Sequence, residues 1–124
     1  MIRTIIFLTA AGAAALVLGV GASARPAATP TLKGTVGPGF TISLKTNGRR
    51  VTTLRPGAYK FVIADKASIH NFTLERESGG KFEKQLTNVS FVGTKSATVT
   101  LKKGKWKYYC TPHESMMFGF FTVK

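Results

Sequence analysis

Cysteine, histidine and acidic side chains are scarce in this sequence. A single cysteine among 124 residues cannot form an intramolecular disulfide, which excludes a small disulfide-stapled fold. Five Asp and Glu residues stand against 18 Lys and Arg residues, so the formal net charge is +13. The length allows one domain and excludes multi-domain enzymes. Because a hydrophobic content of 44% is too high for a disordered basic tail, we expect one folded, strongly basic domain.

The first 24 residues have the pattern of a signal peptide. A positive charge at Arg3 precedes a mostly apolar run from Thr4 to Ala22, and Ala22-Ser23-Ala24 is a small-x-small cleavage pattern. We therefore expect cleavage after Ala24 and export to the periplasm, the cell envelope or the extracellular space. The alternative is an uncleaved membrane anchor, because the run approaches the ~20 residues that span a bilayer. Residues 25–33 are expected to form a flexible lead-in, and residues 34–124 the folded domain.

Alternation of apolar and polar residues predicts an all-β domain after residue 30. Phe40, Ile42 and Leu44 alternate with polar residues ahead of Asn47-Gly48, a typical hairpin turn. The expected strands, separated by turn signals, lie at 40–45, 51–54, 59–64, 72–74, 91–93, 97–101, 105–110 and 118–123. The polar stretch after Gly79-Gly80 shows no clear pattern. About seven or eight short strands favour a two-sheet Greek-key β-sandwich.

The segment 108–119 contains the residues that point to a function. It places Cys110, His113 and two adjacent methionines on a turn between two predicted strands. Thiolate and thioether are soft ligands that favour copper, and imidazole also binds it. Two histidines, one cysteine and a weak methionine form the ligand set of a blue-copper electron-transfer centre. The other histidine of the sequence is His70, at the end of a predicted strand, and it would have to complete the set.

Two motifs of the sequence match a known family. Six residues fit the pattern Tyr-x-Cys-x-Pro-His followed by Met-x-Gly and a last strand, namely Tyr108, Cys110, Pro112, His113, Met117 and Gly119. This segment resembles the C-terminal copper loop of the cupredoxins, the family of plastocyanin, amicyanin and pseudoazurin. His70-Asn71 is similar to the family's upstream ligand histidine and the asparagine that ties its two ligand loops together. The resemblance implies one type 1 copper ion held by His70, Cys110, His113 and Met117, with Asn71 and Pro112 supporting the ligands.

Two features of the copper loop depart from the family pattern. Three residues separate His113 from Met117, a spacing between the shorter amicyanin-like loop and the longer plastocyanin-like loop. Met116 also competes with Met117 for the axial position. We prefer Met117 because it preserves the Met-x-Gly step, and Met116 is the fallback.

The resemblance implies an electron carrier that passes single electrons between redox partners. An enzyme is not expected, because no further histidines remain for a second metal site. In the family one ligand histidine reaches the surface through an apolar patch, so Met116 and Phe118 beside His113 are candidates for docking a partner. Simple core packing is the equally open alternative for these two side chains.

The excess of Lys and Arg favours an acidic redox partner protein or an anionic surface. Nucleic acid is not an expected partner, because the positive residues are scattered and the protein is expected to be exported. We expect a monomer that meets a membrane only if the N-terminal segment stays uncleaved.

Other functions remain open from the sequence. The same ligands could serve copper delivery without a redox circuit. In a metal-free β-sandwich interaction module, Cys110 would be a buried small hydrophobe and both histidines ordinary polar residues. Zinc is disfavoured because structural zinc usually takes four Cys or His ligands, and the sequence has three such residues.

Overall fold

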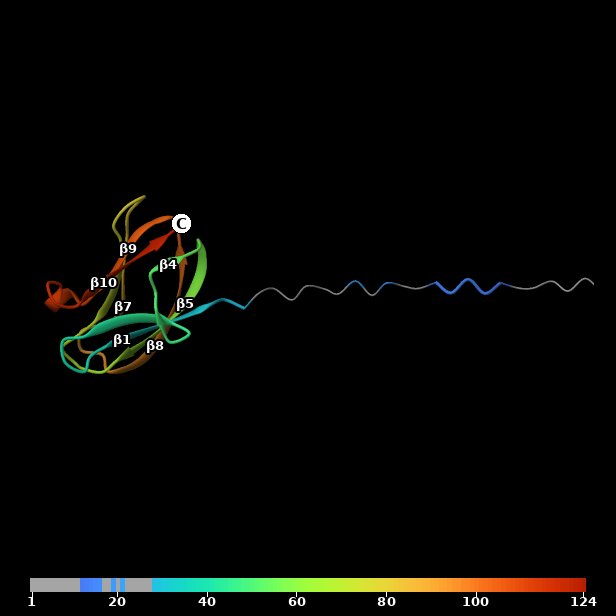
Figure 1. Ribbon diagram of the computed structural model, residues 1–124. Helices are drawn as coiled ribbons and strands as arrows, with labels where there is room; N and C mark the ends of the chain where they lie inside the picture. Colours follow the sequence, from blue (N-terminus) through green and yellow to red (C-terminus); the bar gives the residue numbers. More distant parts are fainter. Residues whose placement is uncertain (1–11, 17–18, 20, 22–27) are drawn as a thin grey trace, which may run out of the picture.

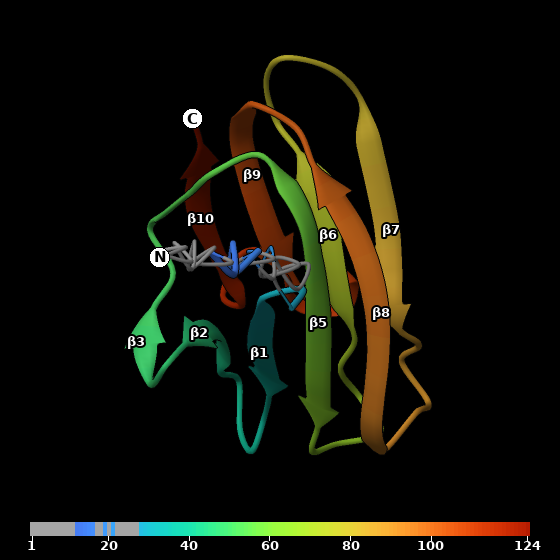
Figure 2. The same cartoon turned by 90° about the vertical axis from the view of Figure 1, so that its right-hand side faces the viewer.

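The computed structural model describes residues 12–16, 19, 21 and 28–124, and its folded part is a sandwich of two five-stranded sheets (Figures 1 and 2). The elements are β1 (Thr31–Val36), β2 (Ile42–Thr46), β3 (Arg49–Arg50), β4 (Thr53–Leu54), β5 (Gly57–Asp65), β6 (Phe72–Arg76), β7 (Phe82–Thr87), β8 (Gly93–Leu101), β9 (Gly104–Tyr109), a 3-10 turn η1 (Thr111–His113) and β10 (Phe118–Val123).

The strand order brings three loops to one end of the sandwich. The first sheet has the order β3-β2-β1-β5-β8 and the second the order β4-β10-β9-β6-β7. Because β1 and β5 are parallel, the loops that follow them, 37–41 and 66–71, leave from neighbouring positions. Because β6 and β9 are antiparallel, with Thr73 opposite Tyr109, the start of β6 adjoins the end of β9 and the loop 110–117. Figure 1 shows this last loop as the orange-red turn at one end of the molecule.

The core lies between the sheets and follows from period-two alternation. In β5, Tyr59, Phe61 and Ile63 are buried while Lys60 is exposed, as expected for a strand with one face on the core. Aromatic side chains of the second sheet stack inside the sandwich: the rings of Phe72 and Tyr108 lie 5.7 Å apart and nearly parallel. A Cβ on Gly119 would overlap the Tyr108 ring, so the glycine makes room for this stack.

The expected all-β, two-sheet sandwich is confirmed, and the last strand has the bounds that the alternation predicted. The lead-in expected at 25–33 is wrong at its end, because β1 begins at Thr31. Leu32 is buried and β1 pairs with strands on both sides, so these residues belong to the core. The strands expected at 91–93 and 97–101 are also wrong as separate units, since β8 runs continuously from Gly93 to Leu101.

Two further differences concern exposed residues. The unassigned polar stretch contains β7, an edge strand whose first four residues are exposed or half-buried, so no alternation marks it. Phe40 was expected in a strand, but β2 begins at Ile42 and Phe40 lies in the preceding loop with 52% of its surface exposed.

Most of the expected signal peptide, 1–24, lies outside the described residues. Among the residues that are described, no helix is both long and apolar enough to cross a membrane.

Candidate metal centre

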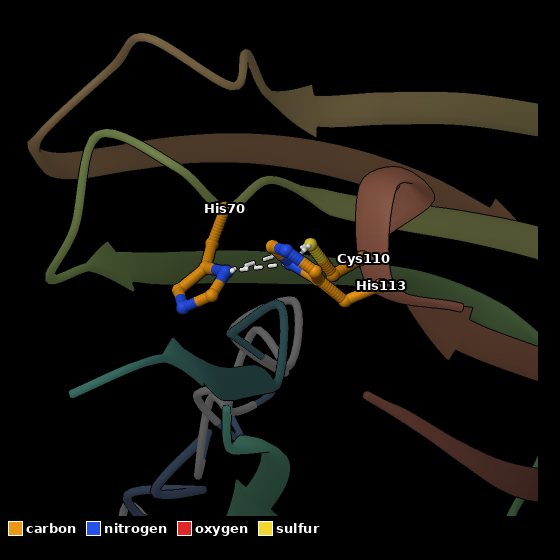
Figure 3. Close-up of side chains that lie close together, drawn as sticks. All are labelled: His70, Cys110 and His113. Carbon is orange, nitrogen blue, oxygen red and sulfur yellow. Dashed lines mark hydrogen bonds between the residues drawn. The ribbon is translucent and has the colours of Figure 1, made fainter. Parts of the chain in front are cut away.

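Three donor side chains converge at the end of the sandwich where the loops meet (Figure 3). His70 is the penultimate residue of the loop that enters β6, Cys110 follows β9 directly, and His113 ends the turn η1. The two ligand loops are brought together by the β6–β9 pairing, although they are 40 residues apart in the chain. The structure thus places together three of the four residues that the sequence predicted as ligands, namely His70, Cys110 and His113.

The donor atoms are close enough to share one ion. The Cys110 Sγ lies 3.8 Å from His70 Nδ1 and 3.6 Å from His113 Nδ1. The two Nδ1 atoms are 3.1 Å apart. Two ligands bonded to one ion at about 2.0–2.3 Å can lie up to about 4 Å apart, and each of these separations is below that limit. The donors are also sheltered, since Cys110 and His70 are buried and His113 is half-buried.

Backbone hydrogen bonds close the loop that carries two of the donors. The N–H of Cys110 donates to Met117 O at 3.0 Å, and the N–H groups of Met116 and Met117 donate to His113 O. Met117 is thereby tied to the cysteine and is completely buried, whereas 59% of the Met116 side chain is exposed. Pro112 occupies the middle of η1 and is exposed. Since it has no N–H and a fixed φ, it restricts the backbone between the two donors.

Asn71 joins the two ligand loops. Its Oδ1 accepts the N–H of Thr111 at 2.8 Å, and its Nδ2 donates to the Thr111 hydroxyl at 3.0 Å. Asn71 is fully buried and Thr111 is half-buried, so the two hydrogen bonds are partly shielded from water. The asparagine therefore fixes the residue after Cys110 relative to the residue after His70.

Sequence reasoning missed two residues of the loop 37–41. His70 Nε2 lies 2.7 Å from the carbonyl oxygen of Gly39, so this ring nitrogen donates and Nδ1 is left to face the other donors. The ring of Phe40 meets both imidazoles edge-on, with centroids 5.6 Å from His70 and 4.9 Å from His113. Gly39 was missed because its contact uses a backbone carbonyl, which every residue type has. Phe40 was missed because the alternation of apolar and polar residues assigned it to a strand.

Comparison with known proteins assigns this arrangement to a family. The model of the copper binding proteins of the plastocyanin/azurin family matches residues 41–124. The chain belongs to this family. It is a cupredoxin, as the motifs around Cys110 indicated.

Solved structures of other cupredoxins show the same fold. The copper protein rusticyanin is 14% identical, with a TM-score of 0.57 over 76% of each chain. Reduced rusticyanin is 19% identical, with a TM-score of 0.53 over 81% of this chain and 82% of that one. A reduced mutant of amicyanin is 14% identical, with a TM-score of 0.50 over 79% of this chain and 86% of that one. No curated protein sequence matches the chain significantly.

The donor set of this cupredoxin fits copper. A thiol and two imidazoles converge, and Met117 of the same loop is fully buried; thiolate, imidazole and thioether are the donor types of a type 1 site. Two nitrogens 3.1 Å apart with a thiol beside both need a shared proton or a shared cation between them. Copper is the cofactor of this cupredoxin fold.

The side chains expected to dock a partner lie on the surface. Met116 and Phe118 are 59% and 45% exposed. The ring of Phe118 packs edge-on against Phe120 at 5.7 Å, on the outer face of the second sheet. Among the described aromatic contacts, the ring that meets the imidazoles is that of Phe40.

Proposed function

We propose that this cupredoxin carries single electrons, with one copper ion held by His70, Cys110 and His113 and by Met117 as a weak axial ligand. The observation that carries the proposal is the convergence of three donor atoms, all within 4.8 Å of one another, at the meeting point of the loops. Copper bound there would alternate between Cu(I) and Cu(II), which supplies the one-electron chemistry.

The role of the protein is to hold the donors in one arrangement for both oxidation states. The Gly39 carbonyl fixes the orientation of the His70 ring through Nε2. The Asn71–Thr111 pair fixes the position of Cys110 relative to His70. A carrier reacts faster when its ligands move little, because reorganisation adds to the barrier of electron transfer. Pro112 contributes by removing an N–H that could otherwise donate to the sulfur.

Exclusion of water supports the same role. Cys110, His70 and Met117 are each at most 1% exposed, and apolar surroundings of this kind tune a metal's potential. His113 is half-buried at the surface, next to the exposed Pro112 and Phe40. We therefore propose that the electron leaves through the His113 edge, with Phe40 and Met116 contacting the partner and Phe118 at the margin of that contact.

We also propose the setting in which the carrier works. The signal-peptide pattern of residues 1–24 supports export, and the net charge of +13 supports an acidic redox partner. We propose a monomer that does no chemistry of its own beyond electron transfer.

The test separates a carrier from a copper-delivery protein. The copper-loaded protein is taken through repeated reduction and oxidation at an electrode, in the presence of a Cu(I) chelator. A carrier keeps its copper and an unchanged voltammetric signal over many cycles, because its buried donors stay in place. Progressive transfer of copper to the chelator during the reduced phases would instead assign the site to delivery.

A further inference from the structure

Positive charge is concentrated on the outer face of the first sheet, away from the copper ligands. Arg50, Lys45, Lys33 and Lys60 are all exposed and lie on four neighbouring strands, β3, β2, β1 and β5. The register places Lys45 opposite Arg50 and Lys33 opposite Lys45. Lys60 stands opposite Thr31, two residues along β1 from Lys33. We call these four residues the cationic row.

The acidic residues do not balance this row. The strands of the first sheet carry one acid, Asp65, and it is buried. Glu75 and Glu83 belong to the second sheet. In the part of the chain that the structure describes, the one salt bridge joins Lys107 to Glu114 at 2.7 Å, so no member of the cationic row is ion-paired there.

On the second sheet, by contrast, one lysine has an acidic partner within the fold. Lys107 pairs with Glu114 and also lies 4.9 Å above the Tyr109 ring. The Tyr109 hydroxyl donates to Glu83 at 2.6 Å. At least this cation of the second sheet thus has an acidic partner within the fold.

Like charges directly opposite each other on neighbouring strands destabilise a sheet. A charged side chain on an edge strand protects the sheet against edge-to-edge aggregation. This accounts for Arg50, because β3 is an edge strand. It does not account for Lys33 and Lys60, because β1 and β5 are interior strands. A sheet that keeps an unbalanced row of cations on interior strands is suited to an external anion.

The surface at the row is hollowed and polar. A groove of about 490 Å³ is lined by residues of β1, β2 and the turn after β2, namely Thr31, Lys33, Thr35, Ser43, Lys45, Asn47 and Gly48. Hydroxyl and amide groups thus flank the two ammonium groups and can donate to the same anion. The lining contains no aromatic or large aliphatic side chain, which protein-protein interfaces use as anchors and single-stranded nucleic acids use for stacking.

We propose that this groove binds a linear phosphate-bearing polymer. Neighbouring strands lie about 4.8 Å apart and alternate residues of a strand about 6.8 Å apart, so the cationic row can contact one extended polyanion at several points along its length. The site is separate from the copper ligands, so its occupation would tether the carrier to an anionic matrix while the copper end stays free for redox partners.

The proposal is tested by measuring the affinity of the purified protein for long-chain inorganic polyphosphate at several salt concentrations. The variant Lys33→Gln/Lys45→Gln should bind at least about tenfold more weakly and show a salt dependence about two units shallower, because two phosphate contacts are lost. The control Lys84→Gln/Lys103→Gln removes the same charge from exposed positions elsewhere and should lose much less affinity. Lys33→Arg/Lys45→Arg should retain binding, and circular dichroism verifies that each variant is folded.

Three results would overturn the proposal. Equal weakening in the two glutamine variants would mean that net charge alone attracts the polymer. Inorganic phosphate that binds as tightly as polyphosphate would reduce the groove to a single-anion site. Binding to vesicles of anionic lipid without binding to polyphosphate would assign the face to a membrane surface.

Discussion

The side-chain amide of Asn71 forms two hydrogen bonds with Thr111. Its Oδ1 accepts from the Thr111 backbone N–H at 2.8 Å, and its Nδ2 donates to the Thr111 hydroxyl at 3.0 Å. These hydrogen bonds directly link the loop of His70 to the loop of Cys110 and His113. They hold His70 in place relative to Cys110 and His113, which come from a part of the chain 40 residues away.

We therefore expect Asn71→Ala to lower the unfolding free energy of the metal-free protein by about 1–3 kcal/mol, since two partly buried hydrogen bonds are lost. It should also speed loss of copper to a chelator. Thr111→Val keeps the backbone N–H bond and should cost about 0.5–1.5 kcal/mol. Chemical denaturation measures both variants and their double mutant, and additive losses would contradict a direct coupling.

The two methionines of the copper loop should respond differently to substitution. Met117→Leu conserves volume and should cost less than about 1.5 kcal/mol, so the fold survives. Loss of the thioether donor should raise the reduction potential and alter the visible spectrum, because the axial ligand tunes a blue-copper site. Met116→Leu, at a 59% exposed position, should leave both unchanged. Voltammetry distinguishes the two, and the reverse result would make Met116 the ligand.

Gly119 should not tolerate a side chain. A Cβ there would overlap the ring of Tyr108, which is held from the other side by stacking on Phe72. Gly119→Ala should destabilise the protein by about 1–3 kcal/mol through overpacking. Thr122→Ala, at an exposed position of the same strand, should stay within about 0.5 kcal/mol of the parent. A thermal melt of the two variants decides the question, and equal stability would show that the ring moves aside freely.

Asp65 should make the metal-free protein less stable as pH rises. Burial raises the pKa of its carboxyl above the ordinary 3.8, against the opposing effects of the Ala67 N–H, the Thr87 side chain and His70. One carboxylate oxygen, Oδ2, has no hydrogen-bond partner, which adds to the cost of ionisation.

The folded state therefore holds this proton more tightly than the unfolded chain does. Its stabilising effect is fully present below pH 3.8 and is lost as pH rises through the raised pKa. Relative to the parent, Asp65→Asn should gain stability across that window and level off above it. Denaturation at a series of pH values measures the difference, and an NMR titration that gives a pKa at or below 3.8 would contradict the account.

The ligand residues were predictable from the sequence because their chemistry is local. Cys110, His113 and Met117 lie within eight residues in an order typical of a copper loop, and a chain with two histidines leaves His70 as the remaining nitrogen donor. The sandwich was predictable for a similar reason, since the residues of strands such as β5 and β10 alternate between buried positions and more exposed ones.

What the sequence could not reveal depends on contacts between distant segments. The Gly39 carbonyl has no side chain to mark it, and Phe40 continues an apolar alternation although its ring lies against the imidazoles. The strand β7 lies at a sheet edge and is mostly exposed, so its pattern is polar. The lysines opposite each other on β1 and β2 become neighbours only through the register.

The visible absorption spectrum of the Cu(II)-loaded protein tests the central claim most directly. We predict an intense blue band from charge transfer between the Cys110 thiolate and copper, with one copper bound per chain. The band should vanish in Cys110→Ser, while circular dichroism shows that the sandwich persists. A colourless protein without bound copper, or a blue band that survives in Cys110→Ser, would contradict the account.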